Sequence, residues 1–379
     1  MESRPEKPAA EEPESRRRGE FIKRVLHLAS FHEWTGAPAV AFAEVEALRR
    51  SGVDARFAYV GGGLLEKRVG RHPFTYGFID HKQNPWTIFR SGTAIRRFIR
   101  QESIDLIHAH LTFDHWLARF AAHGGVPIVR TFHASRSLRD DIATRDLLRA
   151  TSGIAVVNET FLRAPLLRGR KVSFTPPPVD RDQFNITGPD ARASLGLGGD
   201  IPLFGVIGKI APDRGFEEAL HAFATIREGI PSARLLVLGE GPHRENLEKL
   251  SGQLGVQESV VWAGYHEVDL QNYYRAMDVM LFTAPGSEEG HRAVSEAMSC
   301  GVPVVSRPID GISTILGDLA GLLLAPDGDP SAQGAIAAGL YLDGRSKSLR
   351  ESCSAATEGF AFRPAAERLM KLYREAVSS

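Results

Sequence analysis

The segment 283–306, TAPGSEEGHRAVSEAMSCGVPVVS, constrains the fold of this chain more than any other. It follows an apolar run at 279–282 that is typical of a buried parallel strand, and it passes through a Gly/Ser loop into a helical pattern. Gly301 ends the predicted helix, and a second apolar strand follows. This order predicts a parallel α/β sheet, whose carboxyl edge presents loop amides and a helix N-terminus to an anionic ligand. The apolar face of the helix comprises Val294, Ala297 and Met298.

Two glutamates in this segment indicate a ligand that carries hydroxyl groups as well as anionic groups. Glu288 lies in the predicted loop, and Glu296 follows eight residues later on the helix. Because carboxylates repel phosphate, we expect them to contact neutral, hydroxyl-rich parts of the ligand. A nucleotide sugar has two such parts, a ribose and a hexose. The alternative is a pair of surface glutamates on an ordinary helix.

The segment resembles the E-x7-E element of the retaining GT-B glycosyltransferases, most closely that of glycosyltransferase family 4. The resemblance implies that Glu288 contacts the donor sugar hydroxyls and that Glu296 binds the ribose diol. The family usually has a glycine directly after the first acid, whereas here Glu289 precedes Gly290, so either Glu288 or Glu289 can fill the first role. Spacing favours Glu288. The predicted donor-binding segment also includes His291, Arg292 and Ala293.

Composition is that of a multidomain α/β protein. The 379 residues suggest two or three domains, and 43% hydrophobic residues suffice for sizeable cores. Apolar strands alternate with amphipathic helices, which predicts parallel sheets. The two cysteines, Cys300 and Cys353, indicate neither a disulfide framework nor a cysteine metal cage, and they fit a reducing cytoplasm. We expect neither a membrane span nor a signal peptide, because apolar runs are short and the N-terminus is charged and proline-rich.

Charge is balanced overall but divided between the two halves. Residues 1–190 contain 29 Lys and Arg against 22 Asp and Glu, and the remainder has 17 against 24. A basic first half suits a phosphorylated acceptor or an anionic membrane face, although chance and one basic helix explain it equally well. That predicted helix, 85–101, either rests on an anionic membrane or packs on a sheet with its arginines in solvent. Nothing in the sequence indicates a nucleic-acid partner.

A glycine near the first predicted strand is a candidate for phosphate binding. The strand at 24–30 leads through the loop FHEWTGA into a helix from Pro38. Gly36 allows the backbone to approach a ligand closely at the N-terminus of that helix. In the family this loop faces the donor phosphates, which implies a donor-binding role for Gly36. The alternative is a plain turn residue.

Histidines follow two further strands of the first half. The predicted strand 104–111 delivers His108 and His110, and the strand 126–135 carries His133. Such strand ends face the ligand crevice of an open α/β sheet. The stretches resemble the family's H-x-H and T-F-H elements, which implies that His110 hydrogen-bonds the donor sugar and that His133 and His108 lie on the acceptor side. Satisfied core histidines are the alternative. Because no carboxylate or cysteine joins them at ligand spacing, we expect no metal site.

Two cations flank a loop at the start of the second half. Lys209 follows a predicted strand and Arg214 precedes a predicted helix, where both can neutralise a departing diphosphate. The segment resembles the family's G-R-L-x-x-x-K-G element, with Gly208 as its first glycine and the Lys and Arg exchanged. Bidentate binding then falls to Arg214 and the point charge to Lys209. A surface pair without a ligand is the alternative.

The remaining elements complete the predicted organisation. Residues near Tyr265 match the place where family members hold the nucleotide base, and the apolar run 321–326 predicts a further strand. The last amphipathic helix resembles the family's C-terminal helix, which crosses back onto the first domain. We therefore predict a disordered tail at 1–20, a Rossmann-like acceptor domain at 21–185, a Rossmann-like nucleotide-sugar-binding domain at 186–358 and a returning helix at 359–379.

The resemblance covers about residues 21–379 and implies a GT-B fold of two facing Rossmann-like domains. It implies retaining transfer of a sugar from a nucleotide-diphosphate sugar to an acceptor hydroxyl, without metal or cofactor. Expected acceptors are sugars, lipid-linked molecules or small molecules in polysaccharide, lipopolysaccharide or glycolipid biosynthesis, in the cytoplasm or at the inner membrane face. A sugar-nucleotide epimerase and a non-catalytic relative remain alternatives. A dinucleotide dehydrogenase is disfavoured, because SFHEWTGAP lacks G-x-G-x-x-G.

Overall fold

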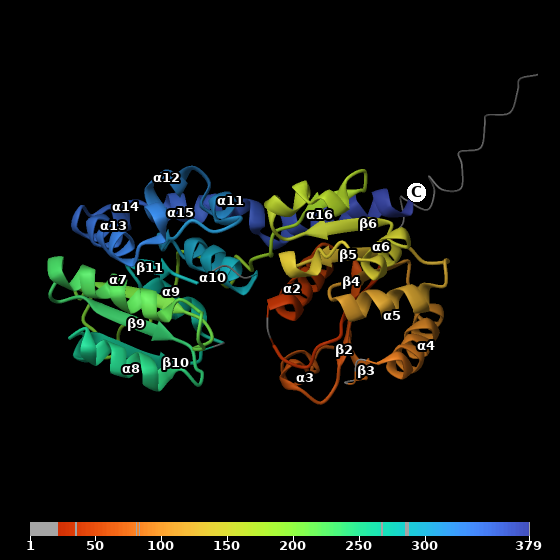
Figure 1. Ribbon diagram of the computed structural model, residues 1–379, viewed down its shortest axis with the longest axis horizontal. Helices are drawn as coiled ribbons and strands as arrows, with labels where there is room; N and C mark the ends of the chain where they lie inside the picture. The colour runs from red at the N-terminus through yellow and green to blue at the C-terminus, as the bar shows by residue number, and fades with distance from the viewer. Residues whose placement is uncertain are drawn as a thin grey trace, which may run out of the picture.

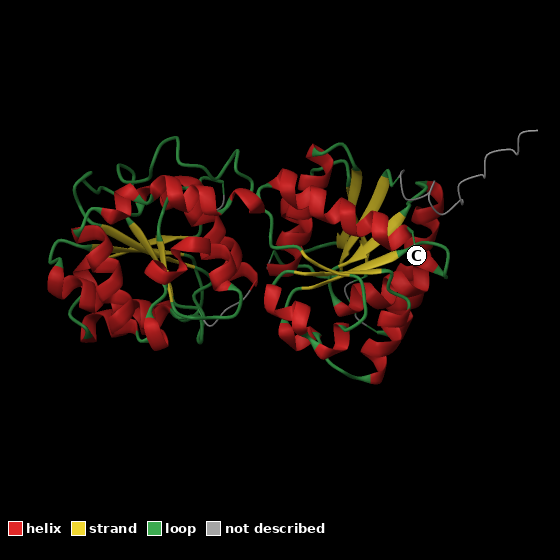
Figure 2. Cartoon of the chain, turned by 90° about the horizontal axis from the view of Figure 1, so that it is seen from above, coloured by secondary structure: helices red, strands yellow, loops and turns green. Residues whose placement is uncertain are grey.

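The computed structural model describes residues 22–378 except residues 35, 81, 83, 267 and 285–287. The predicted tail at 1–20 therefore lies outside the described residues. Within this part the chain forms two parallel sheets, one in each half, and Figures 1 and 2 show helices on both faces of each sheet. No helix among the described residues combines the length and the apolar character needed to cross a membrane.

The first sheet has seven strands in the order β3-β2-β1-β4-β5-β6-β7, all parallel to their neighbours. Strands β4, β5 and β6 are buried along their whole length, as expected for a parallel sheet covered on both faces. The strands are β1 (Arg24–Ala29), β2 (Asp54–Val60), β3 (Thr75–Ile79), β4 (Leu106–Ala109), β5 (Ile128–Phe132), β6 (Gly153–Val156) and β7 (Val172–Phe174).

Helices of the first half connect these strands. The Asn84 side chain caps α4 by accepting a hydrogen bond from the Thr87 backbone N–H at 3.0 Å, and Pro85 occupies the first turn, so this helix has the predicted bounds. The helices are α2 (Gly36–Arg50), α3 (Leu64–Val69), α4 (Pro85–Gln101), α5 (Thr112–Ala122) and α6 (Ile142–Arg149).

The second sheet has five parallel strands in the order β10-β9-β8-β11-β12. These are β8 (Leu203–Ile207), β9 (Arg234–Leu238), β10 (Val260–Gly264), β11 (Val279–Phe282) and β12 (Val304–Ser306). The helices are α7 (Phe216–Gly229), α8 (Arg244–Gln253), α9 (Leu270–Ala276), α10 (Glu288–Ser299), α11 (Ile312–Leu316), α12 (Ala320–Leu323), α13 (Pro330–Leu342), α14 (Arg345–Ser348) and α15 (Arg350–Ala356).

The predicted strand at 321–326 is wrong. The first half of this run, residues 321–323, belongs to the short helix α12, and Leu324 makes only an isolated bridge with Ser306. A short apolar run can be buried as a helix or as a strand, and the sequence pattern does not distinguish the two. Here Leu323 is buried while Gly321 is exposed.

The end of the chain returns to the first half. The Val179 N–H donates a hydrogen bond to the Phe360 carbonyl at 2.8 Å, shortly before α16 (Phe362–Val377) begins. Helix α16 packs on α2 and β6, with Leu369, Leu372 and Tyr373 buried (Figure 1). In each sheet the strand order reverses direction beside the first strand, between β1 and β4 and between β8 and β11. Ligands of doubly wound sheets bind at such points.

Candidate functional site

A cleft of about 1670 Å³ lies between the two halves. Its first wall is formed by the β1–α2 loop, the start of α2 and the residues that follow β4 and β5. Its second wall is formed by the residues that follow β8, β9 and β10, together with α10. The predicted site residues that line the cleft are Gly36, His110, His133, Gly208, Lys209, Arg214, Tyr265, Arg292, Ala293 and Glu296.

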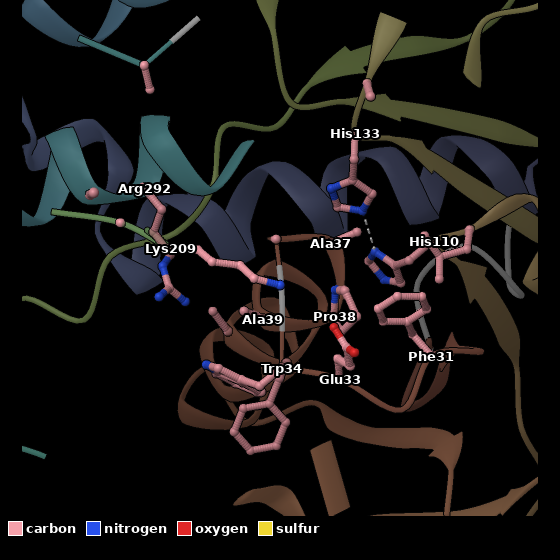
Figure 3. A pocket seen from close by; sticks show the side chains of 18 of the residues that line it. Phe31, Glu33, Trp34, Ala37, Pro38, Ala39, His110, His133, Lys209 and Arg292 are labelled. Atoms are coloured by element: carbon pink, nitrogen blue, oxygen red, sulfur yellow. Dashed lines mark hydrogen bonds between the residues drawn. The ribbon is translucent and has the colours of Figure 1, made fainter. Parts of the chain in front are cut away.

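The amino end of α2 opens onto this cleft. Gly36 begins the helix, no acidic residue occupies its first turn, and Ala37, Pro38 and Ala39 also line the cleft (Figure 3). The first N–H groups of a helix have no partners within the helix, and its dipole places partial positive charge there. The amino end of α2 is therefore a part of the first wall that suits an anion.

Two exposed cations face the cleft from the second wall. Neither Lys209 nor Arg214 has a side-chain hydrogen bond or an ion pair within the part of the chain that the structure describes. The loop that carries both cations ends at Gly215, which follows Arg214 directly and has a φ of +82°. A Cβ at this position would lie 2.4 Å from the carbonyl carbon of Thr283, so only glycine allows the loop to approach the end of β11. The loop thus holds both cations where an anionic ligand can reach them. Figure 3 shows Lys209 extending towards the start of α2.

Among the glutamates of the predicted donor motif, Glu296 is the one whose side chain the structure describes. It is buried, its Oε1 lies 3.2 Å from Arg292 Nε, and its Oε2 accepts a hydrogen bond from the Tyr274 hydroxyl at 3.2 Å. Burial raises the pKa of Glu296, while Arg292 and the Tyr274 hydroxyl act in the opposite direction. These two contacts fix the carboxylate at the margin of the cleft.

The first acid of the motif lies at the start of a helix rather than in a loop. Helix α10 begins at Glu288, so the predicted loop is one residue shorter than expected. The side chains of Glu288 and Glu289 lie outside the described part of the structure. The choice between Glu288 and Glu289 therefore stays a prediction. His291 is buried and is not among the cleft-lining residues, and its predicted donor-site role stays a prediction.

A contact across the cleft was not predicted from the sequence. Arg68 of α3 donates a hydrogen bond from Nη1 to the Tyr265 hydroxyl at 3.4 Å, and its guanidinium lies 4.4 Å from the ring centroid of Trp34. Burial lowers the pKa of Arg68 to about 10, and the carboxylate of Glu296 opposes this shift. No local motif marks Arg68, because only the fold brings α3 opposite the end of β10.

His110 and His133 lie on the first wall and are both buried. His110 Nδ1 is hydrogen-bonded to His133 Nε2 at 3.1 Å, and His110 Nε2 to His27 Nδ1 at 2.9 Å (Figure 3). His133 Nδ1 has no hydrogen-bond partner among the described residues. His133 Nδ1 is therefore a buried ring nitrogen without a partner among the described residues, whereas both nitrogens of His110 are bonded within the protein. Burial lowers the pKa of His133 to about 3 and that of His110 well below its usual value, so both rings are neutral.

The predicted acceptor-side position of His108 is wrong. His108 is fully buried and does not line the cleft. Its Nδ1 is hydrogen-bonded to the Tyr373 hydroxyl at 2.7 Å and its Nε2 to Thr131 Oγ1 at 2.6 Å. His108 lies within β4 rather than after its end, and α16 covers that face of the sheet with Tyr373. The returning helix, which is distant in sequence, thus determines what this histidine contacts.

A carboxylate does join these histidines, contrary to the prediction. Glu44 Oε2 on α2 lies 3.8 Å from both His108 Nδ1 and His110 Nε2, and 4.0 Å from His27 Nδ1. Burial raises the pKa of Glu44 to about 8. The sequence contained a signal, because Glu44 and His27 each interrupt an otherwise apolar, buried face. Their convergence depends on the packing of α2 against the sheet.

Comparisons with known proteins follow the same division of the chain. A sequence model of Glycosyltransferase Family 4 matches residues 34–183, and one of Glycosyl transferases group 1 matches residues 189–358. The chain is 29% identical to a 2-deoxystreptamine glucosyltransferase from Streptomyces kanamyceticus, over 60% of this chain and 66% of that protein. It is 27% identical to a D-inositol 3-phosphate glycosyltransferase from Segniliparus rotundus, over 91% of this chain and 77% of that protein.

Solved structures share the architecture. Anabaena Alr3699/HepE in complex with UDP matches with a TM-score of 0.77 and 17% sequence identity, over 92% of this chain and 98% of that chain. Sucrose-phosphate synthase from Thermosynechococcus elongatus matches with a TM-score of 0.75 and 19% identity, over 93% of this chain and 98% of that chain. These likenesses, together with the two parallel sheets, confirm the predicted GT-B fold.

Proposed function

Because this chain belongs to the group 1 glycosyltransferases of family 4, we propose that its cleft binds a nucleotide-diphosphate sugar and transfers the sugar to an acceptor hydroxyl with retention of anomeric configuration. The observation that carries the proposal is the pairing of two walls. The amino end of α2 lies on one side of the cleft. Lys209 and Arg214, two cations without partners among the described residues, lie on the other. A diphosphate is the part of the ligand that suits both.

Stabilisation of the leaving group follows from these charges. Transfer breaks the bond between the anomeric carbon and the diphosphate oxygen, and negative charge develops on the departing diphosphate. Lys209 and Arg214 are positioned to stabilise that charge, the role that a divalent ion takes in other enzymes. Retention brings the acceptor hydroxyl to the face from which the diphosphate leaves. The same cations then lie beside the incoming hydroxyl, whose proton can pass to the departing diphosphate.

Glu296 supports the binding of the nucleotide. As a carboxylate it accepts hydrogen bonds from the two hydroxyls of a ribose, and the contacts to Arg292 and Tyr274 hold it in one orientation. Glu288 or Glu289 contacts the donor sugar in this proposal. His133 Nδ1 supplies a hydrogen bond from the opposite wall.

The names of the relatives suggest which acceptors to test. The relatives described above are named for transfer to 2-deoxystreptamine and to D-inositol 3-phosphate, so these two polyhydroxylated rings are the first acceptors to test. Polysaccharide, lipopolysaccharide or glycolipid biosynthesis on the cytoplasmic side of a membrane is the proposed context.

Helix α4 supports contact with an anionic membrane. Its exposed side carries Trp86, which is 67% exposed, and Phe89, which is 54% exposed, with ring centroids 5.7 Å apart. Arg90, Arg97 and Arg100 are exposed on the same helix. Aromatic rings beside arginines suit the interface of an anionic bilayer. Cosedimentation with anionic vesicles, but not with neutral ones, is expected, and the Trp86→Ala/Phe89→Ala double variant should lose it. Equal binding to both vesicle types would contradict the membrane proposal.

The activity is tested by incubating the native chain with UDP-, GDP- and ADP-hexoses and each acceptor, and by measuring free nucleoside diphosphate and the anomeric configuration of the product. We expect nucleoside diphosphate to appear only when an acceptor is present, with an α-linked donor giving an α-linked product. An epimerised donor without release of nucleoside diphosphate would indicate the epimerase alternative. An inverted product would contradict retention.

A further inference from the structure

Four buried side chains beneath the first wall form a cluster that the proposed reaction does not use. His27 of β1, Glu44 of α2, His108 of β4 and His110, which follows β4, are each at most 1% exposed. One ligand atom from each lies within 4.8 Å of all the others. The cluster arises from the sheet register, because His27 pairs with His108 and His110 follows on the same face two residues later. Glu44 reaches the three rings from the helix that covers this face.

The carboxylate of Glu44 is buried without a hydrogen-bond partner in the part of the chain that the structure describes, which indicates that the cluster can hold a cation. Neither of its oxygens has a hydrogen-bond partner among the described residues, although both are buried. An unpartnered buried carboxylate is costly and rare in native proteins. Its Oε2 lies 3.8–4.0 Å from three imidazole nitrogens, which is too far for a hydrogen bond. Ligand atoms around a tetrahedral ion are separated by about 3.4 Å when each bond is about 2.1 Å long. The three distances from Oε2 are about 0.5 Å longer than this value, and the 2.9 Å between His27 Nδ1 and His110 Nε2 is about 0.5 Å shorter, so small side-chain shifts place these atoms around a shared cation.

The outward nitrogens of the three histidines support this interpretation. His27 Nε2 is hydrogen-bonded to the Tyr373 hydroxyl at 3.2 Å, His108 Nε2 to Thr131 at 2.6 Å, and His110 Nδ1 to His133 at 3.1 Å. Metal-binding histidines almost always donate their second N–H to such a partner, which fixes the tautomer that directs a lone pair at the ion. Each ring of the cluster has this second contact already.

We propose that His27 Nδ1, Glu44 Oε2, His108 Nδ1 and His110 Nε2 bind a divalent transition-metal ion. Three imidazoles and one carboxylate suit Zn²⁺, and four protein ligands are typical of a closed structural site. Binding replaces the hydrogen bond between His27 and His110, and it replaces the contact of His108 Nδ1 with the Tyr373 hydroxyl. The ion joins α2 to β1 and β4 and supports His133 from behind. Figure 3 shows His110, one of the proposed ligands, on the side of the cleft away from Lys209, so the diphosphate cations act independently of the ion.

Metal content tests this proposal directly. The chain is purified without a histidine tag, and bound metal is measured by inductively coupled plasma mass spectrometry. Native protein should retain about one zinc ion per chain. Glu44→Gln keeps the shape of the side chain but removes its charge, and it should reduce zinc affinity at least tenfold. Glu46→Gln is the matched control, because Glu46 lies on the same helix outside the cluster, and it should retain zinc like the native chain.

A second measurement uses only the native chain, so it does not depend on whether a variant folds. Native protein is stripped with a chelator and titrated with Co²⁺, whose visible spectrum reports tetrahedral ligation. We expect an absorption band that saturates at one equivalent, and zinc should raise the melting temperature of the stripped chain. Native protein that is isolated without metal and gives neither a cobalt band nor a zinc-dependent shift would overturn the proposal. Unchanged zinc retention by Glu44→Gln would overturn it as well.

Discussion

The two walls of the cleft differ in the exposure and the charge of their candidate site residues. On the second wall, Lys209 and Arg214 are exposed cations without partners among the described residues. On the first wall, His110 and His133 are buried, neutral and hydrogen-bonded to each other in a network that reaches Tyr373 of the last helix. The cations of the second wall are thus open to a ligand, whereas the histidines of the first wall belong to a buried hydrogen-bond network. Substitutions on the second wall should therefore affect turnover, and substitutions behind the first wall should affect stability.

The largest expected effect is on the second wall. Lys209→Ala should lower kcat/KM for donor by about 100- to 1,000-fold, because removal of one preorganised charge donor has this effect in other enzymes. The melting temperature should change little, since Lys209 is exposed. Lys249→Ala, an exposed lysine on α8 away from the cleft, is the control and should leave the rate unchanged. Equal losses in both variants would mean that the effect is not local to the cleft.

A smaller effect is expected at the carboxylate of α10. Glu296→Gln should raise the KM for donor by about 10- to 100-fold, since hydrogen bonds to a charged group contribute about 1.5–3 kcal/mol. Glu248→Gln is a matched control, because Glu248 also pairs with an arginine four residues away, on the exposed α8.

The same residue predicts a pH dependence. Because burial raises the pKa of Glu296, the carboxylate becomes protonated at a higher pH than an exposed glutamate. Donor affinity of the native chain should therefore fall as the pH decreases through that raised pKa, and Glu296→Gln should not show this acid limb. KM values measured across the acidic range for both proteins give the answer. An identical acid limb in the two proteins would assign it to another group.

Substitutions in the buried network behind the first wall should lower the free energy of unfolding and leave the kinetic constants almost unchanged. Tyr373→Phe removes the hydroxyl that contacts His27 and His108, and a buried group left without its partner costs about 1–3 kcal/mol. The free energy of unfolding should fall by that amount, while the KM for donor should change less than twofold. Tyr341→Phe is the control, because its hydroxyl has no hydrogen bond among the described residues. A large rate loss at unchanged stability would remove the distinction between the walls.

The smallest effect is expected where the walls meet. The hydrogen bond from Arg68 to Tyr265 is 3.4 Å long, and Tyr265 is 55% exposed. Tyr265→Phe should cost less than about 1 kcal/mol, which corresponds to at most a fivefold rise in the KM for donor. Steady-state kinetics with Tyr341→Phe measured in parallel resolves a change of that size. A rise of a hundredfold or more would contradict the minor role that we assign to this contact.

The sequence predicted the second wall better than the first. The cations and Glu296 belong to short local segments in which one strand, one loop and one helix fix the geometry. Helix α4 was predicted with its observed bounds for the same reason, since the pattern of apolar and basic residues over 85–101 is local. The run at 321–326 was not, because local pattern alone leaves a short apolar segment undecided between helix and strand.

The first wall depends on contacts between distant parts of the chain. Glu44, His108 and Tyr373 come from α2, β4 and α16, and no local pattern shows that they meet. The predicted strand end and the resemblance to the H-x-H element placed His108 on the acceptor side, but the sequence could not show that Tyr373 covers that ring. The sequence analysis also predicted that His110 hydrogen-bonds the donor sugar. In the structure both nitrogens of His110 are bonded within the protein, and the ring nitrogen without a partner among the described residues is His133 Nδ1.

The most direct test of this account is a calorimetric titration of UDP, GDP and ADP into the native chain, Lys209→Ala and Lys249→Ala. We expect one nucleotide to bind at a single site, with affinity reduced about 10- to 100-fold in Lys209→Ala and unchanged in Lys249→Ala. Binding that Lys209→Ala leaves intact, or no binding of any of the three nucleotides, would contradict the central claim that the second wall holds the diphosphate of the donor.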